Sequence, residues 1–372
     1  MKKYLCSFAI LLTLLTTLHL EGVDYNYEAY LESWDPDWQT VYQGLPGVNG
    51  STGYAGVVLD IAFAGYNSGA ANAGLDFTIG NISGIVTFVH NAGGKVKLSF
   101  GGANNGAANY FISSTAGWPS NINSLATYVA GVINTYNLDG VDFDIEDPLP
   151  SGTTAQAFAT NLIQFLQAVR QLLGSSKLIS ITIPGQGWNT YWYYLATGVV
   201  ALGANNPVNC INFMEYDIWV NSSLTFAEQI EADLVTYTSS PTTSPAPNWS
   251  AGWGIPNDLI QLGLMPGCDD TQQFLSVAAA GSLASYVNSE KFYGVMIWDL
   301  DRDSGLDKTP TCSSGYPTGY EYSTQIRTSL EENLTLDSTV KKTARTIRFP
   351  NHNKFRVLPS FKRKAPPLHG AR

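Results

Sequence analysis

One pattern occurs eight times along the chain: short apolar runs are separated by longer stretches with helical periodicity. The apolar runs cover Tyr27–Trp34, Val57–Ala64, Val96–Phe100, Val141–Ile145, Leu178–Pro184, Cys210–Tyr216, Leu259–Met265 and Val295–Trp298. Apolar residues recur at helical spacing in Thr153–Leu173, Ile122–Tyr136, Phe226–Tyr237, Thr271–Val287 and Ser323–Leu334. Buried strands that alternate with helices form a parallel sheet, and eight such units close into a (β/α)8 TIM barrel. An open doubly wound sheet is the alternative, but no G-x-G-x-x-G follows the first run to support a dinucleotide-binding version.

The two ends of the chain differ in composition from its centre. Residues 1–22 place Met1-Lys2-Lys3 before an apolar run, which is typical of a secretory signal peptide. At about 15 residues that run is short for a membrane span, so we expect a secreted protein with no span after cleavage. The segment Lys341–Arg372 holds ten Lys and Arg and no acid, and residues 336–372 are therefore expected to form a basic, disordered tail. A single α/β barrel domain is predicted over residues 23–335.

Charge and cysteine content restrict the partners of this domain. All 30 acids and only 8 bases lie between Glu21 and Val340, so a phosphate backbone would be repelled and nucleic-acid binding is not expected. No Cys/His spacing suggests zinc, and we expect no metal, no cofactor and a monomer. Cys210 lies in an apolar run and is predicted to be a buried free thiol. Cys268 and Cys312 lie in loop-like segments and could form a disulfide in an oxidising compartment.

The most informative segment is a run of alternating acids after Leu138. Side chains of a strand alternate between its faces, so Asp142, Asp144 and Glu146 share one face. The opposite face carries Val141, Phe143 and Ile145, which in a barrel would pack against the helices. The acids would then face the barrel interior, where burying three carboxyl groups in a row is costly.

Three acids on one face suit acid–base chemistry. Neighbouring acids on one strand face are about 6.6 Å apart, so repulsion should leave at least one proton on the group. Glu146 is the last of the three, at the strand end where barrel enzymes place their chemistry, and is the predicted general acid. Asp144 could stay ionised and stabilise positive charge on a substrate, which suits cleavage of a glycosidic bond. A calcium loop or a solvated edge strand are the alternatives, but a calcium loop counted from Asp142 lacks the expected Gly and Glu.

The segment Asp139–Glu146 resembles the D-x-x-D-x-D-x-E signature of glycoside hydrolase family 18, the chitinases and endo-β-N-acetylglucosaminidases. Other motifs of that family follow the same order in this chain. Ser99–Gly102 is similar to its S-x-G-G, Met214–Asp217 to its M-x-Y-D, and Trp298 to its sugar-stacking Trp. Ile61–Ala64 is similar to its second strand, and the resemblance runs from about Asn26 to Leu334.

This resemblance implies a retaining mechanism in which the N-acetyl oxygen of the substrate is the nucleophile. Glu146 would protonate the leaving oxygen and then accept a proton from water. Asp144 would hold the acetamido N–H, Asp142 would tune the charge of Asp144, and Tyr216 would hydrogen-bond the acetamido carbonyl. Such an internal nucleophile gains from the high effective molarity of a positioned group.

The resemblance also implies roles around these residues. Trp298 would form the floor of the sugar site, with Met214 and Asp217 shaping the pocket. Structural support would come from Asp139, Ser99, Gly101 and Gly102. Aromatic faces suit sugar rings, so Trp34, Trp188 and Trp219 are candidate contacts, with ordinary packing as the alternative.

Two features bear on how this chain compares with the family pattern. The segment Asp299–Asp303 is more charged than we expect after the eighth strand. Only Pro266–Asp270 separates the seventh strand from the predicted helix, which leaves no room for a sizeable α+β insertion domain and favours a shallow, open cleft.

The sequence therefore predicts a secreted chitinase-like hydrolase of β-1,4-linked N-acetylglucosamine. Its partners would be chitin or oligosaccharides that contain N-acetylglucosamine. An endo-β-N-acetylglucosaminidase acting on glycoprotein glycans is the first alternative. A non-catalytic carbohydrate-binding protein is the second, but such relatives typically lack the final Glu of the signature, which is present here as Glu146.

Overall fold

The computed structural model describes residues 26–64, 79–102, 122–146, 149, 152–186, 190–241, 252–308 and 315–339. The predicted signal peptide, the tail from residue 340 onward, Trp188 and Cys312 lie outside the described residues. The chain divides into two compact units, Met1–Asn333 and Leu334–Arg372. Cys268 is disulfide-bonded, and its pairing with Cys312 stays a prediction.

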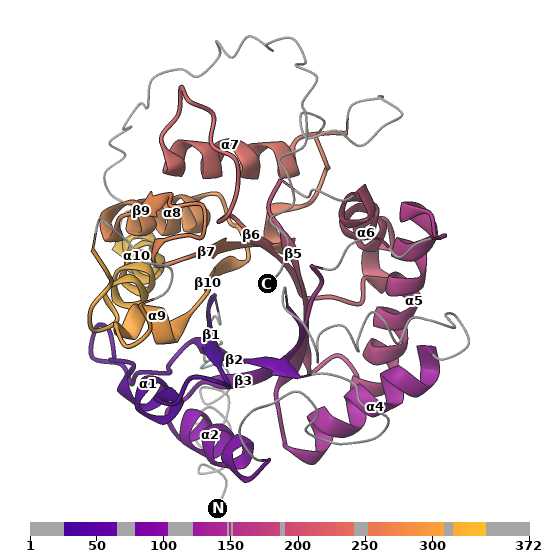
Figure 1. Cartoon of the computed structure of the whole chain (residues 1–372), viewed down its shortest axis with the longest axis horizontal. Helices are drawn as coiled ribbons and strands as arrows, with labels where there is room; N and C mark the ends of the chain where they lie inside the picture. Colours follow the sequence, from indigo (N-terminus) through magenta and orange to yellow (C-terminus); the bar gives the residue numbers. More distant parts are fainter. Residues whose placement is uncertain are drawn as a thin grey trace, which may run out of the picture. The chain divides into compact units, whose positions relative to one another are not determined.

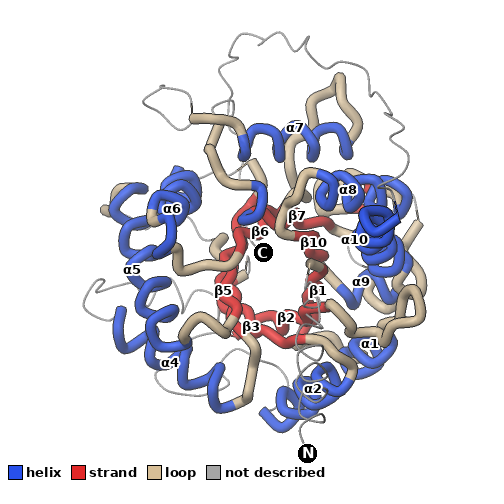
Figure 2. Tube along the Cα trace, turned by 180° about the vertical axis from the view of Figure 1, so that it is seen from behind, coloured by secondary structure: helices blue, strands red, loops and turns tan. Residues whose placement is uncertain are grey.

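Eight of the described strands close into a parallel barrel, as the repeated apolar runs predict (Figures 1 and 2). Around the barrel the strand order is β1-β10-β7-β6-β5-β4-β3-β2, and each neighbouring pair is parallel. Their bounds are β1 Tyr27–Glu32, β2 Val57–Ala64, β3 Lys95–Gly101, β4 Gly140–Asp144, β5 Leu178–Pro184, β6 Cys210–Met214, β7 Ile260–Leu264 and β10 Gly294–Ile297. The fold is therefore a (β/α)8 barrel.

Helices surround this ring of strands in Figure 1. They are α1 Trp38–Gly44, α2 Ile79–Asn91, α4 Ile122–Thr135, α5 Ala155–Leu173, α6 Thr190–Ala201, α7 Phe226–Thr238, α8 Val277–Ser289, α9 Leu300–Ser304 and α10 Glu321–Thr339, with short 3-10 helices at Gly203–Asn205 and Asn257–Leu259. The predicted periodicity of α5 is confirmed, since Phe158, Leu162 and Phe165 are all buried on one stripe. A capping box at Thr225 and Glu228 fixes the start of α7. In the described part of the chain, every helix is too short or too polar to cross a bilayer.

The predicted helix over Thr271–Val287 begins later than its periodicity indicates. Its first residues instead form β9 (Phe274–Leu275), which pairs antiparallel with β8 (Gly267–Cys268). The Asp269 carboxylate accepts from Gln273 N at 2.8 Å and holds this turn. Ser276 then caps α8 by accepting from Ala279 N, because a side-chain cap sets a helix start more sharply than apolar spacing does.

The connection between β7 and α8 is therefore longer than the predicted Pro266–Asp270. It runs from Met265 to Ser276 and holds the short β8–β9 hairpin, without an α+β domain in this fully described segment. The last helix, α10, also continues to Thr339, past the Leu334 that ends the predicted amphipathic stretch.

Many of the side chains inside the barrel are polar. Outward-facing strand residues such as Val141 and Phe143 belong to the apolar core shared with the helices. The inward-facing side chains include ones that are at most 3% exposed, namely Glu28, Asp60, Lys97, Ser180, Cys210, Asn212 and Gln261. Buried polar side chains of this kind are stable only where their charges and hydrogen-bonding groups have partners.

A buried ionic trio provides those partners. Lys97 Nζ lies 2.8 Å from Glu28 Oε1 and 3.2 Å from Asp60 Oδ2, so β1, β2 and β3 are joined by charge. Lys97 also donates to Ser180 Oγ at 2.6 Å, which links the trio to β5.

The prediction for Cys210 is confirmed. Its thiol is free, 3% exposed, and donates to Gln261 Oε1 at 3.2 Å inside the barrel.

Candidate active site

The acids of β4 form a row that rises from the barrel interior to its rim. Asp142 is fully buried and Asp144 is 3% exposed, whereas Glu146 follows the end of the strand and is half-buried. This gradient places the last acid of the run at the carboxyl end of the strands, where solvent and a ligand have access.

Asp142 is held by hydroxyl groups from three other strands. Its Oδ2 accepts from Tyr30 Oη at 2.7 Å and from Ser99 Oγ at 2.8 Å. Its Oδ1 accepts from Ser180 Oγ at 2.5 Å and from Thr182 Oγ1 at 3.0 Å. Four donors satisfy both oxygens and fix the orientation of the carboxylate, which explains how the barrel accommodates an acid that the sequence marks as costly. Tyr30, Ser180 and Thr182 were not found by the sequence analysis, because they belong to strands far apart in the chain.

Gly101 and Gly102 let β3 approach the acid row closely. Gly102 N donates to Asp144 O at 3.1 Å. A Cβ on Gly101, whose φ is +125°, would lie 1.8 Å from that same carbonyl oxygen. A Cβ on Gly102, with φ +94°, would lie 2.5 Å from the ring of Phe63. Both positions therefore require glycine, which gives the Ser99–Gly102 motif a steric explanation.

We expect Gly101→Ala to displace β3 from β4 at Asp144. Because the new methyl group meets backbone rather than a flexible side chain, the free energy of unfolding should fall by roughly 1–3 kcal/mol. Urea denaturation checks this, with Gly131→Ala at an exposed position of α4 as the control, since a Cβ there meets nothing within 4 Å. The control should stabilise the chain slightly, by about 0.5–1 kcal/mol. Equal effects of the two substitutions would contradict the steric explanation.

Met214 and Tyr216 bring the end of β6 to the same region. Both are buried, and they share an apolar cluster with Tyr30, Met265 and Met296 inside the upper barrel. Burial, and then the negative charges of Asp144 and Glu146, raise the pKa of Tyr216 well above its usual value. The phenol therefore keeps its proton near these two acids and can act as a hydrogen-bond donor.

Asp217 links two loops at this rim. Its N–H donates to Asp269 Oδ2 at 2.8 Å, and its Oδ1 accepts from Asp270 N at 2.7 Å. The loop after β6 is thus fastened to the β8–β9 hairpin. Burial, with the charges of Asp270 and Asp269, raises the pKa of Asp217 to about 7.

This shift predicts a loss of stability as the pH rises. The unfolded chain loses the Asp217 proton near pH 3.9, whereas the folded chain keeps it to about pH 7, so ionisation between these values disfavours folding. Asp217→Asn retains the acceptor oxygen and removes the titration. From pH 4 to pH 8, the free energy of unfolding of wild type relative to that of this variant should fall by roughly 2–4 kcal/mol. This range allows for solvent screening of the partly exposed Asp217 side chain. Denaturation at both pH values measures it, and parallel pH profiles would disprove the assignment.

Three aromatic rings form a platform beside the acid row. Trp298 stacks on Phe63 with ring centroids 5.3 Å apart, and Phe63 stacks on Trp34 at 5.8 Å. Tyr30 meets Trp298 edge-on at 5.4 Å. Trp34 is 43% exposed, so the platform reaches the surface. The structure thus brings together two of the predicted aromatic residues through Phe63, to which the sequence analysis assigned no role.

Three predicted residues remain, namely Trp219, Asp139 and Trp188. Trp219 is 51% exposed on the loop after β6, where Gln186 Nε2 donates to its carbonyl oxygen at 2.8 Å. Asp139 lies at the opposite end of β4 from Glu146, and its Oδ2 accepts from Val96 N at 2.8 Å. Trp188 lies outside the described residues.

Comparison with known proteins identifies the family of this chain. Residues 29–283 match the family described as "Glycosyl hydrolases family 18". The chain belongs to glycosyl hydrolase family 18. Solved structures agree with this family-18 fold. Domain 2 of the Pyrococcus furiosus chitinase has a TM-score of 0.59 at 19% identity, covering 83% of this chain and 96% of that one. A GH18 chitinase from Pseudoalteromonas aurantia has a TM-score of 0.56 at 19% identity, with coverages of 82% and 100%.

Curated relatives of this family-18 chain are similar over a shorter segment. It is 35% identical over 106 residues to the secreted chitinase LysM12 of Penicillium expansum. It is 30% identical over 103 residues to the killer toxin subunits alpha/beta of Kluyveromyces lactis. These alignments cover 27% and 26% of this chain, but only 6% and 8% of those much longer proteins.

Proposed function

We propose that this family-18 chain is a secreted, chitinase-like glycoside hydrolase that cleaves β-1,4 bonds between N-acetylglucosamine units. The observation that carries the proposal is the row Asp142, Asp144 and Glu146, which rises to the rim beside the Tyr216 phenol. The likeness of part of the chain to a secreted chitinase supports both the substrate and the secretion.

The proposed reaction begins with proton transfer from Glu146 to the glycosidic oxygen. As the bond between that oxygen and the anomeric carbon breaks, the acetamido oxygen of the same sugar attacks the anomeric carbon and forms an oxazolinium ion. Water then adds to the anomeric carbon and gives its proton to Glu146, which restores the acid. Two attacks from opposite faces retain the configuration.

The other residues position and stabilise this intermediate. Asp144 accepts the acetamido N–H and offsets the developing positive charge, while Asp142 below it is held in place by its four hydroxyl donors. Tyr216 donates to the acetamido oxygen and fixes its angle of attack. Trp298, supported by Phe63, offers an apolar face to the sugar ring.

The short β7–α8 connection supports action within chains. Only the β8–β9 hairpin lies between Met265 and Ser276, so no domain raises a wall beside the platform in this segment. A cleft that is open on this side would admit a polysaccharide laterally, at internal bonds. Release of almost nothing but dimers from polymer ends would contradict this endo mode.

Product analysis on defined N-acetylglucosamine oligomers, run beside a high-mannose glycoprotein, tests the proposal. Cleavage of the oligomers with retention at the anomeric carbon is the expected result. Glycan release without oligomer cleavage would instead identify an endo-β-N-acetylglucosaminidase. Saturable oligomer binding without any turnover would identify a non-catalytic binding protein.

A further inference from the structure

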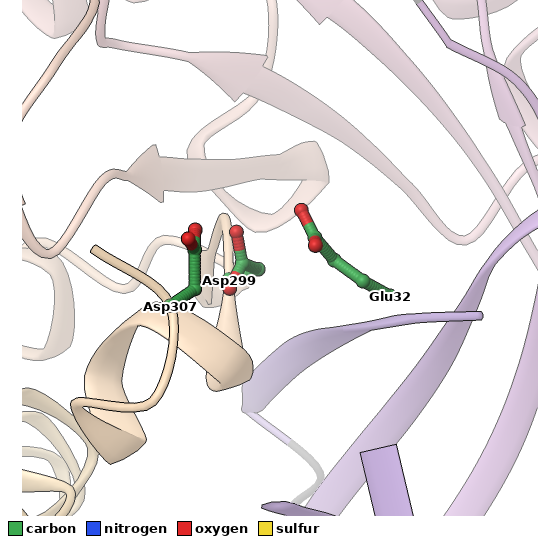
Figure 3. A group of neighbouring side chains, drawn as sticks. All are labelled: Glu32, Asp299 and Asp307. Carbon is green, nitrogen blue, oxygen red and sulfur yellow. The ribbon is translucent and has the colours of Figure 1, made fainter. Parts of the chain in front are cut away.

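Three carboxylates from separate segments meet at the rim of the barrel, as Figure 3 shows. Glu32 ends β1, Asp299 follows Trp298 after β10, and Asp307 follows α9. One oxygen from each residue lies within 4.8 Å of the other two. Asp299 belongs to the charged segment that departs from the family pattern, whereas Glu32 lies far from it in the sequence.

Asp299 offers the cluster a buried carboxylate oxygen. The residue is fully buried, and its Oδ1 accepts from Arg302 N at 2.7 Å, as the cap of α9. Its Oδ2 is also buried and has no hydrogen-bond partner among the described residues. Figure 3 shows an Asp299 oxygen pointing to the space between Asp307 and Glu32. A buried acceptor left unsatisfied costs roughly 1–3 kcal/mol, so an ordinary structural role does not account for it.

Negative charge exceeds positive charge around this space. Asp35 and Asp301 add their charges to the cluster, and Arg302 is the one cation among the principal electrostatic neighbours. Among the described residues, a single guanidinium is therefore set against five carboxyl groups.

We propose that Glu32, Asp299 and Asp307 bind one Ca²⁺ ion. An all-oxygen, anionic ligand set suits a hard divalent cation. The three oxygens lie within 4.8 Å of one another, which is close enough for all of them to reach one ion. Magnesium demands near-ideal octahedral geometry and is usually held by one or two carboxylates, whereas calcium accepts a flexible set of several carboxylates and waters. Water completes the coordination.

The ion would connect β1 to the segment after β10. Glu32 lies two residues before Trp34, and Asp299 directly follows Trp298, so both ligands adjoin residues of the aromatic platform. Calcium at this point stabilises the rim that carries the platform, a role separate from the proposed proton transfers at Glu146.

Terbium luminescence on the full, chelator-stripped chain tests the site. Trp298 adjoins a ligand and should sensitise bound Tb³⁺, giving a saturable signal for one site that Ca²⁺ displaces. Calcium 100-fold above its Kd should raise the Tm by about 4 °C. Glu32→Gln and Asp307→Asn should each weaken binding at least tenfold. Asp258→Asn, an exposed acid before β7, is the control and should change binding less than twofold.

Three results would overturn the proposal. Wild type showing no saturable binding up to about 10 mM Ca²⁺, well above the range of weak extracellular calcium modules, would remove the site. Unchanged affinity in Asp307→Asn would place the ion elsewhere. Binding of Mg²⁺ as tight as that of Ca²⁺ would refute the choice of cation. The wild-type titration decides the first and third points even if a variant fails to fold, and none of these readouts depends on hydrolysis.

Discussion

Glu146→Gln is expected to lower kcat/KM on a chromogenic chito-oligosaccharide by a factor of at least about 10³. This lies within the range that general acid–base catalysis supplies. Glutamine has nearly the shape of glutamate but cannot donate or accept the proton that the proposed reaction transfers. Glu146 is half-buried and follows the end of β4, so the exchange should leave the fold intact. The Tm should therefore stay within about 2 °C of wild type.

Glu290→Gln is the matched control for this variant. Glu290 is exposed at the end of α8, and the same chemical change there should leave both kcat/KM and the Tm unaltered. Equal rates for wild type and Glu146→Gln would refute the assignment of the general acid. A fall in rate that follows a fall in Tm would show that the substitution acts through folding instead.

Lys97→Met should cause a large loss of stability. Lys97 is 1% exposed and is paired with both Glu28 and Asp60. Removing one partner of a buried ionic group leaves the others uncompensated, which typically costs about 3–5 kcal/mol. Urea denaturation at pH 7 measures the difference.

The pH dependence of that loss gives a second test. Burial already raises the pKa of Glu28 and Asp60, and the charge of Lys97 opposes this rise. Without the lysine, both acids should hold protons in the folded chain to higher pH. The variant should therefore lose more stability than wild type as the pH rises from 5 to 8.

Two further variants complete this test. Lys291→Met removes an exposed lysine and should change the free energy of unfolding by less than about 0.5 kcal/mol. Combining Lys97→Met with Glu28→Gln and Asp60→Asn should recover part of the stability, because no unpaired charge remains. A loss below about 1 kcal/mol for Lys97→Met alone would mean that the trio contributes little.

Much of the fold was predictable because its signals are local. Each barrel strand lies within two residues of a predicted apolar run, since burial on both faces leaves a contiguous apolar segment. The alternation in Asp139–Glu146 also predicts which acids face inward, and Asp142 lies fully buried in the barrel. The late start of α8 was missed because Thr271–Ser276 continues the apolar spacing while forming part of a hairpin.

Other parts of the site depend on contacts that sequence spacing does not contain. A register shift between Ile61 and Ala64 interrupts the alternation of β2 where Phe63 joins the platform. Three of the four hydroxyl donors to Asp142 come from β3 and β5, the strands paired with β4, whereas Tyr30 comes from β1 and is brought there by closure of the barrel. Barrel closure also brings Glu32 and Asp299 together. β1 and β10 are paired in space although they lie at opposite ends of the domain's sequence.

The free thiol of Cys210 gives this barrel a built-in reporter. A sulfur atom enclosed by the ring of strands can meet an alkylating reagent only when those strands separate. The rate of thiol alkylation therefore reports how often the barrel opens, without an attached dye or an engineered residue. A bound sugar or ion that keeps the strands together should lower this alkylation rate.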